Sequence, residues 1–357
     1  MISNLFSLFL GLGLHLCSRF KNLVIAMRME SSTQAEDGPW LALPYHSIRD
    51  KGCSMSLQSV SSNKVHHCEL PASAGGKNIC GSSSSFLIMV DETSEITMID
   101  PTTNALFVLP RIPTSWEPKY STDINSGEIL ETRKYLVHKA VLSSPPDCSP
   151  YDYILMVIHG EERELAYYTA WNQTWIKVQE AGRYYDDIIF NMGEFYAVDE
   201  YGKVILCQPG FPPNIEEIAM PWLFRGSKIY LVGMANELCV VIRFLKDNPT
   251  VGYETYKFEV HLLESYEQRI HIGNLEGWTF FLGQNESVAL PTEVFKGVKG
   301  NCIYFTDDNL DAYKYGVIGG HDLGVFDMEK ESFQPLQCCQ RNVTSAWPRP
   351  VWLTSDN

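Results

Sequence analysis

The strongest constraint in this sequence is a long series of short extended segments separated by turn residues. Between residues 60 and 340, runs rich in Val, Ile, Phe and Tyr alternate with Gly, Pro, Asn and Asp, the pattern of strands joined by turns. Within 256–263, Phe258, Val260 and Leu262 alternate with polar residues, which is typical of a half-buried strand. The pattern predicts an all-β chain with almost no helix.

The extended segments fall into groups of four, which occupy residues 64–110, 135–180, 187–220, 228–273 and 278–336. After the first group, successive groups start roughly 44 to 52 residues apart, the length of one four-stranded propeller blade. A blade has two apolar faces, which it covers by packing against its neighbours around a ring. We predict a kelch-like β-propeller of about six blades, with segments 40–60 and 351–353 as candidates to complete the sixth blade and close the ring.

The chain divides into residues 1–38, the propeller at 39–340 and a C-terminal tail at 341–357. The first 29 residues carry three cations and no acid around an apolar run, which favours a mitochondrial or chloroplast targeting segment followed by a polar linker. Three alternatives stay open: a translation start at Met27 or Met29, a secretory signal, and a location in the cytoplasm or nucleus.

Charge restricts the partners of the chain. With 28 Lys and Arg against 43 Asp and Glu, the net charge is −15, which argues against a nucleic-acid binder because such a protein needs surplus cations. After the N-terminus there is no uninterrupted run of about 20 apolar residues, so we expect no stable transmembrane span. We expect a monomer with a protein partner.

Short motifs along residues 39–336 carry a family resemblance. In order they are Pro39–Pro44, Cys80–Ser83, Asp100–Pro110, Lys139–Pro145, Phe195–Asp199, Phe281–Gly283, Gly300–Asp308 and Leu323–Asp327. In this order they resemble the plant domain of unknown function 295, also described as the KIB-type or F-box-associated β-propeller. The resemblance implies a propeller that holds a protein partner.

Many members of that family carry an F-box, a three-helix module that docks on a Skp-type adaptor of a cullin ubiquitin ligase. Residues 43–48 imitate an F-box opening, but the Ser-rich run after Gly52 does not favour helices. We therefore expect that this chain lacks an F-box, which puts the Skp-type adaptor in doubt. The alternative is a substrate receptor of a ubiquitin ligase with its F-box lost or truncated.

Motifs for chemistry point away from an enzyme. The sequence has no G-x-S-x-G, H-E-x-x-H, P-loop or dinucleotide fingerprint, so we predict no catalytic residues and no cofactor. The ten cysteines form no C-x-x-C pair, and the segment 66–68 lacks a recognised ligand pattern, so we predict no metal site. The pairs 186–187, 199–200 and 307–308 are interpreted as acidic turn residues at solvated blade edges. A carbohydrate-binding or enzymatic propeller is the least favoured alternative.

Loop length indicates where a partner would bind. Loops from the second to the third strand of a blade, and from the fourth strand to the next blade, share one face. That face receives the long connections 111–134, 246–255 and 307–322, and long loops in compact repeat proteins tend to be functional. Large or cationic side chains in and near these loops are the predicted partner-binding residues: Arg111, Trp116, Lys119, Tyr120, Arg133, Tyr253, Tyr313 and Tyr315. The alternative is that the aromatic side chains fold back onto their own blade.

Overall fold

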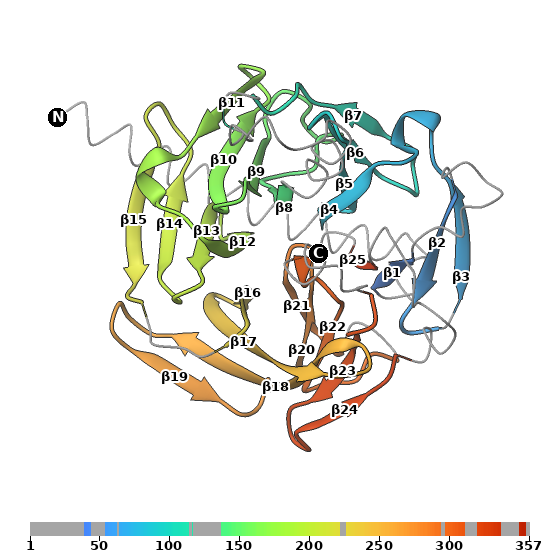
Figure 1. Ribbon diagram of the computed structural model, residues 1–357, viewed down its shortest axis with the longest axis vertical. Helices are drawn as coiled ribbons and strands as arrows, with labels where there is room; N and C mark the ends of the chain where they lie inside the picture. The colour runs from blue at the N-terminus through green and yellow to red at the C-terminus, as the bar shows by residue number, and fades with distance from the viewer. Residues whose placement is uncertain are drawn as a thin grey trace.

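The computed structural model describes residues 39–43, 54–62, 64–113, 116, 137–221, 226–293, 297–310, 320–336 and 350–354. Within these ranges the regular secondary structure is strand apart from two short 3₁₀ helices, η1 (Ala72–Ala74) and η3 (Gln179–Ala181). Figure 1 shows the strands grouped radially around a centre, in the order of the sequence. The predicted β-propeller is confirmed.

Three described sheets are regular antiparallel quartets whose first strand lies innermost. They consist of β4 (Asn78–Ser83), β5 (Phe86–Val90), β6 (Ile96–Ile99) and β7 (Leu106–Val108), then β8 (Val137–Leu142), β9 (Ile154–His159), β10 (Glu164–Thr169) and β11 (Thr174–Lys177), then β12 (Tyr185–Asn191), β13 (Glu194–Asp199), β14 (Val204–Gln208) and β15 (Asn214–Ala219). Their inner strands are almost entirely buried at the centre of the ring.

The two ends of the chain share one sheet, which closes the ring. Its strands are β1 (Trp40–Leu43), β2 (Ser54–Ser59), β3 (Val65–Glu69) and, innermost, β25 (Val351–Leu353). Trp40 pairs with Leu353 and Ala42 with Val351, and Figure 1 shows β25 beside β1 near the centre. The hydrogen bonds between these strands therefore join the first and last described strands in one sheet.

The remaining strands form the fifth and sixth blades. They are β16 (Lys228–Met234), β17 (Glu237–Asn248), β18 (Gly252–Leu263) and β19 (Arg269–Ile272), then β20 (Trp278–Leu282), β21 (Val288–Pro291), β22 (Cys302–Phe305), β23 (Gly324–Asp327) and β24 (Ser332–Gln334). One parallel bridge, Gly233 to Val288, joins the two blades. In the sixth blade β20 and β22 run parallel, with β21 antiparallel to β20 on the inner side.

Two expectations about strand grouping are wrong. Segment 64–69 forms β3 of the ring-closing sheet, and the sheet after it begins at β4, whose sequence NICGSS reads as a turn. Position 81 of β4 is a glycine because a Cβ there would collide with the carbonyl oxygen of Ala140 on the neighbouring inner strand. The second miss is β21, which is a fifth strand within 278–336, where four were expected.

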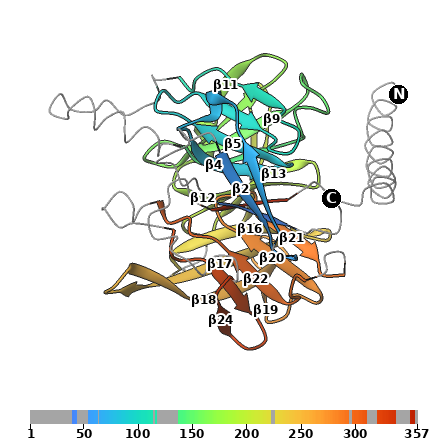
Figure 2. The same ribbon diagram turned by 90° about the vertical axis from the view of Figure 1, so that its right-hand side faces the viewer.

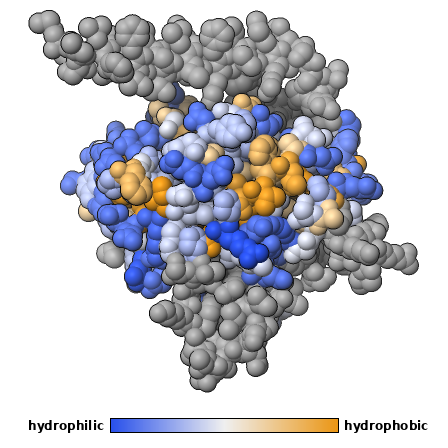
Figure 3. Space-filling model, turned by 90° about the horizontal axis from the view of Figure 1, so that it is seen from above, coloured by the Kyte–Doolittle hydropathy of each residue, from blue (hydrophilic) through white to orange (hydrophobic). Residues whose placement is uncertain are grey.

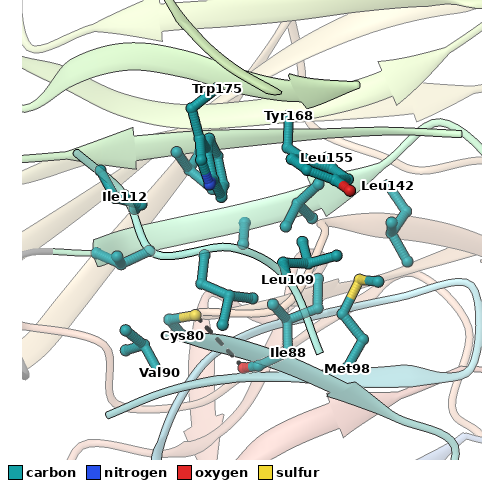
Figure 4. Close-up of a cluster of buried hydrophobic side chains, with 14 of the residues drawn as sticks. Cys80, Ile88, Val90, Met98, Leu109, Ile112, Leu142, Leu155, Tyr168 and Trp175 are labelled. Atoms are coloured by element: carbon teal, nitrogen blue, oxygen red, sulfur yellow. Dashed lines mark hydrogen bonds between the residues drawn. The ribbon is translucent and has the colours of Figure 1, made fainter. Parts of the chain in front are cut away.

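Apolar contact between adjacent sheets makes up most of the core. Between β4–β7 and β8–β11, buried side chains from both sheets interdigitate in a cluster that we name the apolar seam (Figure 4). Its members include Ile88, Met98, Leu155 and Trp175, and the Trp175 indole donates a hydrogen bond to the carbonyl of Pro110. Trp175 thus packs between these two blades.

Candidate partner-binding face

One face of the ring carries the β9–β10, β13–β14 and β17–β18 turns and the starts of the inner strands; we name it the connection face. The hairpin of β17 and β18 is the longest in the described chain, with 12 residues in each strand. Figure 2 shows this hairpin extending beyond the neighbouring sheets. Residues 308–310 also lie on this face, because they contact the first residues of β12 and β16 around one cavity.

Three of the predicted partner-binding residues fall within the described chain. Arg111 is exposed, while Trp116 is half-buried with its ring centroid 5.6 Å from that of His159. Tyr253 is only 6% exposed, and its hydroxyl donates to the carboxylate of Asp307 at 2.7 and 2.8 Å. Tyr253 therefore supports the face from within. The other five, Lys119, Tyr120, Arg133, Tyr313 and Tyr315, lie outside the described residues.

Beneath the connection face, seven buried charged side chains and the half-buried Lys228 form a charged hub. The buried members are Lys139, Asp186, Asp187, Arg243, Asp307, Asp308 and Asp322. At its centre, Arg243 on β17 is 2% exposed. Its guanidinium donates to Asp308 at 3.0 Å and to Asp322 at 2.8 Å. Burial opposes the charged form, but Tyr230, Asp322 and Asp308 outweigh it and hold the pKa of Arg243 well above its usual range. The guanidinium is thus a fixed cation that joins two blades.

The carboxylates of the hub differ in pKa because each has different charged neighbours. Burial alone would raise the pKa of Asp308. The positive charges of Lys228, at 3.2 Å, and of Arg243 have the larger effect, so the pKa of Asp308 lies below its usual value. Burial raises the pKa of Asp186 to about 6 despite the opposing attraction of Arg163, whose guanidinium is 2.5 Å away. Burial also raises the pKa of Asp187, which pairs with Lys139. The Lys139–Asp187 pair ties the inner strands β8 and β12 of adjacent blades together.

A segment between β20 and β21, residues 283–288, contacts three other blades across the centre of the ring. Glu286 donates its backbone N–H to the Ser82 carbonyl, and its carboxylate accepts from Ser83 at 2.5 Å and from the Phe190 amide at 2.9 Å. The side-chain amide of Gln284 donates to the His138 carbonyl. The centre is therefore occupied by the chain itself.

The cavity at the mouth of the hub is small, about 50 Å³, and Lys228, Arg243 and Asp308 are among its lining residues. That space is far below the several hundred Å³ typical of a small-molecule site. In the described part of the chain, no group of three or more His, Cys, Asp or Glu side chains could hold a metal ion. The hub's charges are directed at one another, so it can stabilise the face.

A larger groove opens between the β17–β18 hairpin and the β23–β24 pair, with a volume of about 340 Å³. Its lining residues are Val251, Glu254, Thr255, Phe305, His321, Asp322, Leu323, Gly324, Phe333, Gln334 and Pro335. They come from 307–322, which loop length selected, from 246–255 and from the outer strands of the sixth blade. The expectation that 246–255 is a long connection is wrong, because β17 continues to Asn248 and β18 begins at Gly252, which leaves only 249–251 between the strands. This groove offers a concave, partly apolar surface on the connection face.

The interpretation of the acidic pairs as solvated turn residues is wrong at two of three places. Asp187 and Asp307 are fully buried, and Asp186 and Asp308 nearly so. Asp199 accepts hydrogen bonds from two backbone amides of its own turn, as a turn residue does. The sequence carried a signal for the buried pairs, because Lys139 and Arg243 are single cations inside apolar strands and need such partners.

On the side of the molecule shown in Figure 3, polar side chains dominate and apolar ones form small patches between them. Within the described residues, no helix is long and apolar enough to cross a membrane.

Comparison with known proteins shows what the chain resembles. Residues 55–327 match the family profile described as KIB1-4 beta-propeller. The F-box protein SKIP23 of Arabidopsis thaliana is 25% identical over 248 residues, which cover 64% of this chain and 60% of that protein. The putative F-box protein At5g55150 of the same plant is 25% identical over 282 residues, 76% of this chain and 74% of that protein. The chain therefore spans about 60% of the length of the first of these relatives.

Two solved structures align with this chain at low sequence identity. A chain of the nidogen/laminin complex aligns with 90% of this chain and all of its own length, at 11% identity and a TM-score of 0.47. The β-propeller domain of Cps50 (Swd1) from Myceliophteria thermophila covers 66% of this chain and 86% of its own, at 10% identity and a TM-score of 0.30.

Proposed function

Because this chain belongs to the KIB1-4 β-propeller family, we propose that it is a non-catalytic module that holds a protein partner on its connection face. Its curated relatives are named F-box proteins, which supports an interaction propeller of an F-box-related family. We also propose that it corresponds to the domain of unknown function 295 within that family.

The contrast between the hub and the groove supports this proposal most directly. The hub's buried charges are paired within the chain and leave a cavity of about 50 Å³, whereas the groove of about 340 Å³ opens on the same face. A surface of this kind suits a protein segment better than a reaction centre, since a reaction centre needs a positioned acid, base or nucleophile facing its substrate.

Site-specific photo-crosslinking tests the face. A benzophenone amino acid replaces Arg111, Tyr201 or Val251 on the connection face, or Met192 in the β12–β13 turn on the opposite face; Tyr201 and Met192 are 57% and 65% exposed. We expect the same protein adduct from the three connection-face positions and none from Met192. Adducts from Met192 alone, or from no position, would contradict the proposal.

A second candidate function is that of substrate receptor in a Skp-cullin-F-box ubiquitin ligase, favoured by the names of the two relatives. Pull-down of the full chain with a purified Skp-type adaptor separates the two candidates. Retention of the adaptor supports the ligase role, and its absence leaves partner binding as the function.

For the compartment, we propose import into mitochondria or chloroplasts, supported by the acid-free, cationic N-terminus of the sequence. Fluorescent fusions of the full chain and of a chain starting at Met29 provide the test. We expect an organellar signal that is lost on truncation, and identical diffuse signals from both fusions would refute import.

A further inference from the structure

The floor of the groove is aromatic and reaches the surface through Phe333 of β24. This side chain is 38% exposed, although its ring centroid lies 4.8 Å from that of Phe326 and 6.0 Å from that of Phe305. Both neighbours are 3% exposed. Phe333 is therefore the outermost member of an aromatic cluster, with tilted and edge-to-face ring contacts, that continues into the core. Burial of its exposed surface would remove further apolar area from water.

Other exposed apolar side chains line the same groove. Val251, at the tip of the β17–β18 hairpin, is 37% exposed, and Pro335 is exposed at the end of β24. Single exposed apolar residues are ordinary on protein surfaces, but their gathering in a concave site indicates an interaction. A volume of about 340 Å³ lies at the lower end of the range for ligand sites, so it suits one large side chain rather than a folded element.

The charges that line the groove are of one sign. Its charged residues are Glu254 and Asp322, both carboxylates. Asp322 is held by Arg243, whereas Glu254 pairs with Lys246 at 2.8 Å in a pair whose side chains are 41% and 54% exposed. The side-chain amide of Asn248 also donates to Glu254 at 2.9 Å. Because such exposed contacts are weak, the Glu254 carboxylate can exchange them for an incoming cation. The net charge of −15 adds a field of the same sign.

We propose that the groove binds a segment of the protein partner that inserts one large aromatic or aliphatic side chain beside Phe333 and carries Lys or Arg next to it. The inserted side chain would cover Phe333 and Val251, and the neighbouring cation would meet Glu254. A cation over the exposed ring of Phe333 would add a cation–π contact. This inference rests on the proposed function and names the chemistry of its partner.

Selection of phage-displayed random 12-residue peptides on the full chain tests the groove directly. We expect the enriched peptides to share a large apolar residue flanked by Lys or Arg. Phe333→Ala and Val251→Asp should each weaken their binding at least tenfold by fluorescence anisotropy. Glu254→Lys should weaken it about threefold, and this loss should shrink at high salt because screening acts on exposed charges. Val251 lies in an exposed turn, so Val251→Asp keeps the test valid if Phe333→Ala folds poorly.

Two matched variants outside the groove serve as controls. Tyr256→Ala removes an exposed aromatic side chain from the same hairpin, and Glu267→Lys reverses an exposed charge in the turn between β18 and β19. Both should leave peptide affinity unchanged within twofold.

Absence of enrichment, enrichment of acidic peptides, or equal binding to wild type and Val251→Asp would each overturn the inference. If the crosslinked partner still binds Val251→Asp and Phe333→Ala normally, the groove inference fails while partner binding on the connection face stands. If no connection-face position yields an adduct, the proposed function itself fails.

Discussion

The apolar seam and the charged hub join neighbouring blades by opposite means. The seam between β4–β7 and β8–β11 consists of interdigitated side chains such as Ile88 and Leu155, both with no exposed surface (Figure 4). At the hub, Arg243 joins β17 to Asp308 and Asp322 of the sixth blade through charge-assisted hydrogen bonds. The seam gains stability from area removed from water, whereas the hub gains it only while every charge keeps its partner.

This difference teaches where the chain tolerates change. An apolar contact loses stability in proportion to the atoms removed and the cavity left. Removal of one partner from a buried ion-pair network exposes the full desolvation cost of the charges that remain. Substitutions at the hub should therefore cost more, per atom removed, than substitutions at the seam.

The largest effect is expected from Arg243→Met, which keeps the side-chain length but removes the buried cation that Asp308 and Asp322 share, so that Asp308 keeps only Lys228. We expect a loss of about 4 kcal/mol in the free energy of unfolding, measured by urea denaturation. Arg183→Met is the control, because Arg183 pairs with Glu162 at the surface and is 54% exposed, and it should cost less than about 1 kcal/mol. Equal losses for the two variants would remove the distinction between hub and surface.

The next effect concerns the seam. Leu155→Ala creates a cavity among buried side chains and should cost about 3 kcal/mol, with no dependence on pH between 5 and 8 because no titrating group is removed. Leu106→Ala on β7, where the side chain is 37% exposed, is the matched control and should cost much less. A loss at Leu155 below that at Leu106 would show that the seam is loosely packed.

The smallest effect depends on pH and lies at the edge of the seam. His159 is 4% exposed, and burial, with a further contribution from Lys177, lowers its pKa to about 4. In the unfolded chain the histidine has a pKa near 6.5. As the pH falls from 6.5 toward 4, protonation therefore favours the unfolded state, and the free energy of unfolding decreases over that range. At pH 5 the loss is about 2 kcal/mol.

His159→Leu should remove this pH dependence, which parallel denaturation curves at pH 7 and pH 5 would measure. Leu155→Ala provides the comparison, because it should shift both curves equally. If His159→Leu loses as much stability between pH 7 and pH 5 as the wild type does, His159 is not the titrating group.

The strand patterns in the sequence predicted the propeller fold but not the position of every strand. Segments such as 256–263 carry an alternation that fixes both strand and buried face. β4 was not predicted as a strand because Gly81, Ser82 and Ser83 make contacts with other blades. Gly81 allows a close approach to Ala140, and the two serines donate hydrogen bonds to Trp352 and Glu286. Such contacts join residues far apart in the chain, so local sequence carries no trace of them.

For the connection face, too, the sequence predicted some features and missed others. The sequence indicated 246–255 and 307–322, and residues of both segments line the groove, although 246–255 is the end of a strand hairpin and not the long loop expected. It also indicated Tyr253 as an anchor, and the structure instead places its hydroxyl on Asp307. Phe333 and Val251 were not selected, because their exposure depends on how two blades pack.

The sequence by itself determined that this chain forms short strands in quartets, since hydrophobic alternation and turn residues act over a few neighbouring positions. The tertiary structure alone decided that Asp187 and Asp308 are buried beside Lys139 and Arg243, and that residues 283–288 cross the centre of the ring. The reason is physical: burial and charge pairing depend on the distance between residues in space, which closure of the ring sets.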